Sequence, residues 1–171
     1  MSGRRRRARG FTLFELVVVI AVFAALVTML LDRLFSLQEA AEKAAMESTL
    51  RGIKTGLQVR LAELIIANRE GEAGLLEVED PVRWLEEARP ANYGGAYREP
   101  PAPETWYFDA AERQLVYVVN TGDRLEIGGQ PGVKQLRFRV RLVRDPIQLP
   151  GGLLERINGI AMAPVHPYRW P

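Results

Sequence analysis

The sequence predicts an α+β protein in which one long N-terminal helix is followed by a small antiparallel β-sheet head. An unbroken apolar run covers residues 11–31 and passes into an amphipathic helical pattern that lasts to about residue 69. After residue 105 the period of the apolar residues changes to two, as expected of strands. With 171 residues, the chain is long enough for one ordinary domain and one additional element.

Basic residues gather at the N-terminal tip. The chain holds 23 Lys and Arg, 21 Asp and Glu, and no Cys, for a formal charge of +2. Five arginines precede residue 11, which leaves 18 basic against 21 acidic residues beyond them, a balance of −3. The basic character therefore belongs to the tip, and nucleic acid is not expected as a partner of the body. The lack of Cys excludes disulfides, zinc–thiolate sites and cysteine nucleophiles.

The apolar run of residues 11–31 has 21 residues and a single charge, Glu15. As a helix it spans about 31 Å, close to the thickness of the hydrocarbon core of a bilayer. The arginines before it predict that the tip stays in the cytoplasm and that the rest of the chain lies outside the inner membrane. A cleaved secretory signal would have a shorter apolar core. A plain signal anchor would leave both Glu15 and the Gly10–Phe11 junction unexplained.

The junction that follows the basic leader reads Gly10-Phe11-Thr12-Leu13-Phe14-Glu15-Leu16. It resembles the processing site of type IV pilins and type II secretion pseudopilins, closely over residues 4–31 and only in architecture beyond them. The resemblance implies that a prepilin peptidase cleaves after Gly10 and that Phe11 is then N-methylated. It divides the chain into a cleaved leader (1–10), a transmembrane helix (11–31), an amphipathic stem (32–69), a variable connecting region with a short helix (70–104) and an antiparallel β head (105–171).

The resemblance also implies a role in assembly for Glu15. A carboxylate within lipid costs about 3 kcal/mol even on lenient scales, so it needs a partner charge. Cleavage would create an α-amino group on Phe11, one helical turn from Glu15. In the family this glutamate meets the amine of a neighbouring subunit and sets the register of docking. An acid that lies near the lipid headgroups without a partner is the alternative interpretation.

Function, partners and location are likewise implied by the resemblance. The chain would be a structural subunit rather than an enzyme, held by a single pass in the inner membrane with its head in the periplasm. It would join other pilin or pseudopilin subunits on an inner-membrane assembly platform and could reach the cell surface after assembly. The shared N-terminus leaves open a type IV pilus, a type II secretion pseudopilus and competence machinery. A binding subunit at a pilus tip, for DNA uptake or surface adhesion, is the alternative function.

Two departures from the family pattern favour a minor subunit. Major pilins commonly carry a Pro near the outer end of the apolar segment and a Gly within it. Here Asp32 and Ala24 occupy those positions, and no Pro or Gly occurs between Phe11 and Arg51. The helix should therefore resist local melting.

The stem continues the helical pattern beyond the apolar run. Apolar residues recur every three or four positions, at Leu30, Leu34, Leu37, Ala41, Ala44, Leu50, Ile53, Leu57, Leu61 and Leu64. Two i,i+4 pairs, Glu39 with Lys43 and Glu47 with Arg51, are in the favourable order. The helix is predicted to end near Asn68, since glycines follow within a few residues.

Gly52 and Gly56 form a pair of small residues four apart within this stem. They indicate either close approach of another backbone or two glycines that merely soften the helix, by about 1 kcal/mol each.

The connecting region is predicted to hold one short helix over residues 80–88. Asp80 is a suitable N-cap, Pro81 occupies the first helical position, and Trp84 and Leu85 are its expected buried contacts. Residues 92–95 read as a turn and residues 99–103 as an extended linker.

The head is predicted as a sheet of three or four antiparallel strands that covers the outer half of the stem. Residues 105–108 and 114–119 form a hairpin, and residues 134–144 form a strand with strict alternation. Residues 146–152 read as a loop, and residues 154–163 as a weaker last strand.

Candidate binding chemistry in the head is sparse. Arg137, Arg139 and Arg141 line one face of a predicted strand, but no aromatic residue shares that face, as a nucleic-acid site usually requires. His166 is the only histidine, and the acidic residues Glu77, Glu79 and Asp80 match no metal-ligand spacing. The sequence therefore predicts no catalytic residue, no metal site and no cofactor.

Overall fold

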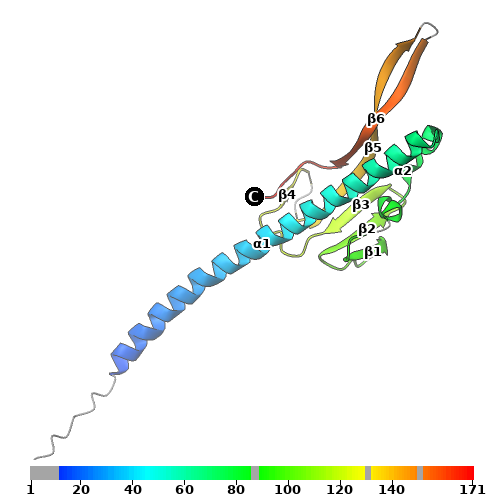
Figure 1. Cartoon of the computed structure of the whole chain (residues 1–171). Helices are drawn as coiled ribbons and strands as arrows, with labels where there is room; N and C mark the ends of the chain where they lie inside the picture. Colours follow the sequence, from blue (N-terminus) through cyan, green and yellow to red (C-terminus); the bar gives the residue numbers. More distant parts are fainter. Residues whose placement is uncertain (1–11, 86–88, 130–131, 150–151) are drawn as a thin grey trace, which may run out of the picture. The chain divides into compact units, whose positions relative to one another are not determined.

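A computed structural model of the chain describes residues 12–85, 89–129, 132–149 and 152–171. The chain divides into two compact units, Met1–Gln38 and Glu39–Pro171. Helix α1, Leu13–Ile66, runs through both (Figure 1). The predicted class, a long N-terminal helix followed by a mostly antiparallel sheet, is confirmed.

The first unit contains the apolar part of α1. Every described residue from 12 to 38 is exposed except Ser36, which is half-buried. Large apolar side chains therefore cover all sides of this part of the helix, including Phe14, Ile20, Phe23 and Leu30. A helix that is apolar all round is stable only where something other than water surrounds it.

The second unit begins with the rest of α1, which buries one stripe of side chains. Ile53, Leu57, Leu61 and Leu64 lie on this stripe, as the periodicity predicted. Helix α1 ends in the predicted place, because Asn68 adopts a left-handed conformation with φ 56°. The N–H of Arg69 then donates to the carbonyl of Leu64 at 2.8 Å, and that of Asn68 to Ile65 at 3.1 Å, which is a Schellman motif.

The predicted stripe is wrong in the turns before Leu50. Ala41 and Ala44 are exposed, whereas Glu39, Glu42 and Met46 are buried. The apolar pattern misplaced this face because it assigns glutamate to solvent. Here the head supplies hydrogen-bond donors to both carboxylates, which offsets the free-energy cost of burying them.

Short helices form the connecting region: η1 (Glu70–Glu72), α2 (Leu75–Val78) and η2 (Pro81–Trp84). Asp80 caps η2 as predicted, since its Oδ1 accepts a hydrogen bond from the N–H of Val82 at 2.9 Å. The predicted helix is only one 3₁₀ turn in its described part, and residues 86–88 lie outside that part. Leu85 is buried as expected, whereas Trp84 is only half-buried.

Gly56 of α1 lies against Leu85 of the connecting region. A Cβ atom there would meet Cδ2 of Leu85 at 2.0 Å, whereas a Cβ at Gly52 would meet nothing within 4 Å. Only one of the two glycines therefore permits a close approach. The approaching group is a side chain rather than another backbone.

The main sheet has five strands in the order β1-β2-β3-β5-β6. These are β1 (Tyr93–Ala96), β2 (Thr105–Asp109), β3 (Gln114–Val118), β5 (Gln135–Leu149) and β6 (Gly152–Pro164). All neighbours are antiparallel except β1 and β2, which are parallel. A separate antiparallel pair joins β4 (Glu126–Ile127) to β7 (Tyr168–Arg169).

Strand β1 occupies residues predicted as a turn. A Cβ at Gly94 would meet Cε1 of Tyr107 at 2.5 Å, so only glycine fits there without a shift of that ring. Gly95 has φ +85°, and the register with β2 shifts between Tyr93 and Ala96. The glycines thus serve a bulged edge strand rather than a turn.

Strands β5 and β6 are longer than predicted and replace most of the expected loop at 146–152. Pro146 is accommodated because β3 pairs with β5 only up to Phe138, so at Pro146 the strand has one neighbour, β6. The predicted alternation of β5 is confirmed: Leu136, Phe138, Val140 and Leu142 are buried.

The core of the second unit lies between the sheet and α1 (Figure 1). The ring of Trp106 is fully buried, with its centroid 4.8 Å from that of Tyr117 and 6.0 Å from that of Phe138. Burial of each large apolar side chain contributes roughly 1.5–3 kcal/mol, so this cluster anchors the sheet on the helix.

Candidate functional site: the N-terminal helix and the clasp of the head

The first turn of α1 is closed by a side-chain cap. The hydroxyl of Thr12 accepts a hydrogen bond from the N–H of Glu15 at 3.2 Å, and the carbonyl of Thr12 accepts one from Leu16 at 3.1 Å. Thr12 and Glu15 have the three-residue spacing of a capping box, and an acidic side chain is favourable at a helix N-terminus. Gly10 and Phe11, the predicted cleavage and methylation residues, lie outside the described residues.

Glu15 is exposed on this first turn, among apolar side chains. Leu13 and Phe14 beside it are 82% and 78% exposed. Glu15 and the next charged residue along the chain, Asp32, lie at opposite ends of the apolar segment. The carboxylate therefore marks one end of an apolar surface that no part of the first unit covers.

The hydroxyl groups of Thr28 and Ser36, in the part of α1 that belongs to the first unit, are satisfied locally. Thr28 Oγ1 donates to the carbonyl of Ala24 at 2.9 Å, and Ser36 Oγ donates to that of Arg33 at 2.8 Å. Such bonds remove the main cost of placing a hydroxyl in lipid or against another helix. Among the described residues, α1 is the one helix long and apolar enough to cross a membrane, and its most apolar 18-residue window has a mean hydropathy of 2.7.

Two buried carboxylates on α1 hold the head, and pattern reasoning missed both. Glu42 accepts hydrogen bonds at Oε1 from the N–H of Asn120 (2.7 Å) and the hydroxyl of Tyr117 (3.2 Å). Its Oε2 accepts from both the N–H (3.0 Å) and the hydroxyl of Thr121. Burial next to the charge of Glu42 also raises the pKa of Tyr117. Glu42 thus organises the turn that follows β3, and none of the described residues forms an ion pair with it.

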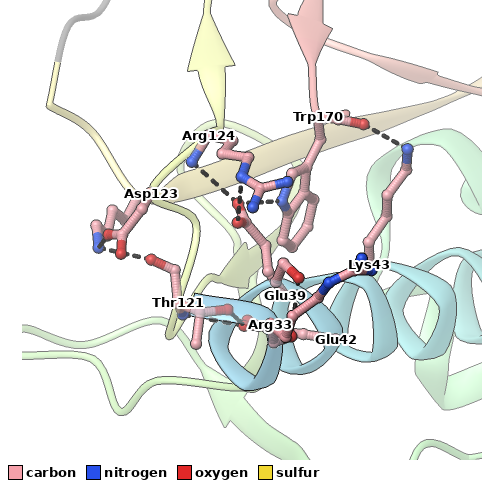
Figure 2. Close-up of polar contacts among 10 residues, drawn as sticks. Arg33, Glu39, Glu42, Lys43, Thr121, Asp123, Arg124 and Trp170 are labelled. Carbon is pink, nitrogen blue, oxygen red and sulfur yellow. Dashed lines mark hydrogen bonds and ion pairs between the residues drawn. The ribbon is translucent and has the colours of Figure 1, made fainter. Parts of the chain in front are cut away.

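Glu39 binds the other end of the chain, as Figure 2 shows. Its Oε1 accepts a hydrogen bond from Nε1 of Trp170 at 2.9 Å and one from the N–H of Arg124 at 3.0 Å. The guanidinium of Arg124 lies 3.7 Å from its Oε2, and Nζ of Lys43 donates to the carbonyl of Trp170. We call Glu39, Lys43, Arg124 and Trp170 the C-terminal clasp.

The predicted ion pair between Glu39 and Lys43 is therefore wrong, because each side chain binds Trp170 instead. The predicted pair of Glu47 and Arg51 is confirmed, with 3.6 Å between Oε2 and Nη1. The difference is one of environment, since Glu47 and Arg51 face solvent and Glu39 faces the head.

The three arginines predicted to line one face of the strand, Arg137, Arg139 and Arg141, do not form one continuous basic face. Nη1 of Arg137 donates to Oδ2 of Asp109 at 2.9 Å, and its guanidinium lies 5.4 Å from the centroid of the Tyr97 ring. Although burial opposes the charge of Asp109, the hydrogen bond from Arg137 holds its pKa below the ordinary value. Arg139 and Arg141 lie further along the strand, beyond the last residue of β5 that pairs with β3.

The acidic residues of the connecting region have structural partners. Glu77 Oε1 accepts a hydrogen bond from the N–H of Leu142 at 2.7 Å, and its Oε2 accepts one from Arg144 at 2.8 Å. Asp80 caps η2 and also accepts a hydrogen bond from the hydroxyl of Tyr93, which together with burial raises the pKa of that tyrosine. Within the described ranges, no three His, Asp or Glu side chains are grouped as a metal site would require.

Comparison with known protein families matches residues 5–31 to the prokaryotic N-terminal methylation motif. No curated protein and no solved structure matches the chain. The match covers the leader, the junction and the apolar run, and stops where the amphipathic stem begins. The chain thus carries a methylation motif on an exposed apolar helix, and this combination supports a relationship to the type IV pilin-like proteins.

Proposed function

We propose that the protein is a minor pilin or pseudopilin, a structural subunit that is processed by a prepilin peptidase. It is then assembled into, or primes, a type IV pilus or a type II secretion pseudopilus. The observation that carries the proposal is the methylation motif at residues 5–31 together with the exposed apolar helix that begins within it. Such a surface needs lipid before assembly and other apolar helices after it.

In this proposal, cleavage after Gly10 on the cytoplasmic side leaves Phe11 as the N-terminal residue, which is then methylated. Its amine is a cation four residues before Glu15 in the sequence. In lipid or in a packed bundle of helices, a carboxylate and an amine are each costly alone and far less costly together. Glu15 would therefore pair with the amine of a neighbouring subunit and fix the depth at which the two helices dock.

The continuity of α1 supports a minor subunit. The helix is uninterrupted from Leu13 to Ile66 and so passes through Ala24 and Asp32, where major pilins commonly have Gly and Pro. A minor subunit is present in few copies and primes assembly or occupies the tip.

Mass spectrometry of the protein isolated from its host tests the processing. We expect a chain that begins at Phe11 and carries one methyl group on its amine. Recovery of the intact leader, from Met1 to Gly10, would contradict the proposal at its first step.

A pair of isosteric variants tests the assembly role. The Glu15→Gln variant should be cleaved and methylated normally. It should be lost from sheared filaments or from cross-linked subunit complexes, because its neutral amide cannot form an ion pair with an amine. Asp32→Asn is the matched control, since it removes the acid at the other end of the apolar segment and should assemble normally. Equal incorporation of both variants would exclude the pairing.

The orientation is tested with single cysteines, which the cysteine-free chain allows. Ala45 is exposed on α1 of the second unit, so Ala45→Cys should react with a membrane-impermeant maleimide in cells whose outer membrane alone has been opened. Labelling that appears only after the inner membrane is dissolved would place the head in the cytoplasm and overturn the proposed topology.

A further inference from the structure

The surface beside α2 has an open cavity of about 490 Å³, which lies outside the clasp and outside the N-terminal segment. Four arginines and two glutamates line it: Arg113, Arg139, Arg141, Arg144, Glu77 and Glu112. We name it the arginine pocket. Its charged lining carries a balance of +2, on a body whose balance beyond the leader is −3.

The topology of the sheet creates the pocket. Strand β3 pairs with β5 only from Gln135 to Phe138, so the next residues of β5 have a free edge on that side. At this edge, Oε1 of Glu77 accepts a hydrogen bond from the N–H of Leu142 at 2.7 Å. Because N–H groups alternate along a strand, Val140 presents its N–H to the same edge. The pocket thus combines a backbone donor with the surrounding guanidinium groups.

Half of the arginines are already engaged and half are available. Arg144 pairs with Glu77 at 2.8 Å, and Arg139 donates to the carbonyl of Glu112 at 3.3 Å. Arg113 and Arg141 are exposed, and within the described part of the chain neither guanidinium has a hydrogen bond or an ion pair, although the charge of Arg141 helps to lower the pKa of Glu77. Two guanidinium groups therefore face the pocket with their donors free, which is an arrangement suited to a carboxylate.

The backbone at Arg113 is strained. This residue closes the turn between β2 and β3 with φ 55°, a conformation that favours glycine and costs other residues about 1 kcal/mol. Glycine at this position would make a better turn but would remove a guanidinium from the pocket. Arg113 thus adds a positive charge to the pocket, whereas glycine would give a more stable turn between β2 and β3.

The lining fits an acidic protein segment better than a nucleic acid. No aromatic side chain lines the pocket, so a base would have nothing to stack on. Arg137, which would extend the basic surface along β5, is engaged by Asp109 and Tyr97. A carboxylate needs no stacking partner, and its two oxygens match the planar donors of a guanidinium.

We propose that the arginine pocket receives an acidic segment of a neighbouring protein subunit in the assembly. The inference rests on the proposed function for the identity of the neighbour, but not for the chemistry of the site. Charge complementarity favours this occupant, because the body of this chain is itself mildly acidic beyond the leader, with 21 acidic against 18 basic residues, and a subunit of similar composition would carry carboxylates for the pocket.

The test uses the full-length protein in neutral detergent and a fluorescein-labelled hexaglutamate peptide, with binding measured by anisotropy at about 0.15 M salt. The double variant Arg113→Gly, Arg141→Ser should weaken peptide binding by about tenfold or more, because each lost contact is a charge-assisted hydrogen bond. Arg113→Gly should also fold at least as well as the parent chain, since glycine relieves the strained turn. The matched control, Arg98→Ser, removes an exposed arginine outside the pocket and should bind as the parent does.

Equal peptide affinity for the parent chain and the double variant would overturn the proposal. So would a labelled oligothymidylate that binds more tightly than the peptide and loses affinity in the same variant, because the pocket would then serve nucleic acid. Neither result depends on N-terminal processing. A failure of the pocket and a failure of the proposed function are distinguished by the mass of the native N-terminus and by the behaviour of Glu15→Gln.

Discussion

At the scale of single residues, the buried carboxylate of Glu42 joins α1 to the head. It is 8% exposed and receives two backbone N–H groups and two hydroxyls. Loss of the carboxylate would leave the buried hydroxyl of Tyr117 and the partly buried donors of Asn120 and Thr121 without this acceptor. An unsatisfied buried group costs about 1–3 kcal/mol, and a partly buried one costs less because water can reach it. The acid is therefore a stabilising part of the core rather than a tolerated charge.

Glu42→Ala should lower the free energy of unfolding of the head by about 3 kcal/mol or more, as measured by denaturant unfolding in detergent. The matched control is Glu47→Ala, which lies on the next turn and breaks the exposed pair with Arg51, worth about 0.3–0.5 kcal/mol. Comparable losses in the two variants would show that the hydrogen bonds to Glu42 contribute little.

Glu77 gives the head a dependence on acid pH. Burial opposes its charge, but the hydrogen bonds from Arg144 and Leu142 outweigh it, so its pKa in the folded protein lies below the ordinary 4.5. A lowered pKa means that the stabilisation is complete above the unfolded value and is lost as the pH falls through the folded value. The melting temperature should thus fall between pH 5 and more acidic values, and this fall should be smaller in Glu77→Gln.

Glu70→Gln is the control for this titration, since Glu70 is exposed. Its melting temperature should follow the same curve as that of the parent chain. A Glu77→Gln variant with an unchanged acid response would assign the titration to another group. Asp109, whose pKa is lowered by Arg137 against the effect of burial, is the next candidate.

At the scale of elements, the sequence predicts best where the evidence is local. The end of α1 at Asn68, the cap at Asp80 and the alternation along β5 depend on residues close together in the chain. The burial of Glu39 and Glu42 could not be predicted in this way, because their donors lie 75 to 131 residues further along. The same holds for β1, whose glycines resemble a turn until Tyr107 of the neighbouring strand is in place.

The same contrast between local and distant contacts applies to the candidate sites. The junction around Glu15 is a contiguous motif, so its proposed role could be stated from the sequence alone. The arginine pocket joins side chains from α2, the β2–β3 turn and β5, and the sequence suggested only an arginine stripe along one strand. The position where β3 ends against β5 decides which arginines meet, and no local pattern encodes that position.

The two glycines of α1 provide a matched test at this scale. Gly52→Ala should stabilise the protein by about 0.5–1 kcal/mol, because the added methyl group meets open space and alanine favours the helix. Gly56→Ala should instead destabilise it, since its Cβ would meet the buried Leu85 at 2.0 Å. Thermal unfolding of both variants under one condition gives the comparison. An equal gain in stability would mean that Leu85 moves aside at no cost.

At the scale of the whole molecule, the two units have separate tasks. The first unit exposes an apolar helix with Glu15 in its first turn, and everything proposed for processing depends on residues before Gln38. The second unit holds its own helix segment through a buried apolar stripe, through Glu42 and through the clasp at Glu39. The clasp joins this helix segment to Trp170, 131 residues beyond Glu39 in the chain.

The clasp therefore allows the two tasks to be separated by one substitution. Trp170→Phe keeps much of the apolar contact but removes the Nε1 donor to Glu39, so it should destabilise the head by about 1–3 kcal/mol. Processing should not change, since cleavage and methylation concern the first unit alone. The measurements are the melting temperature of the purified variant and the mass of its N-terminus, with Arg169→Ala, an exposed neighbour, as the control. A variant that melts normally would show that the indole hydrogen bond is dispensable. A variant that retains its leader would show instead that the peptidase requires a closed head, which would join the two tasks that the division of the chain separates.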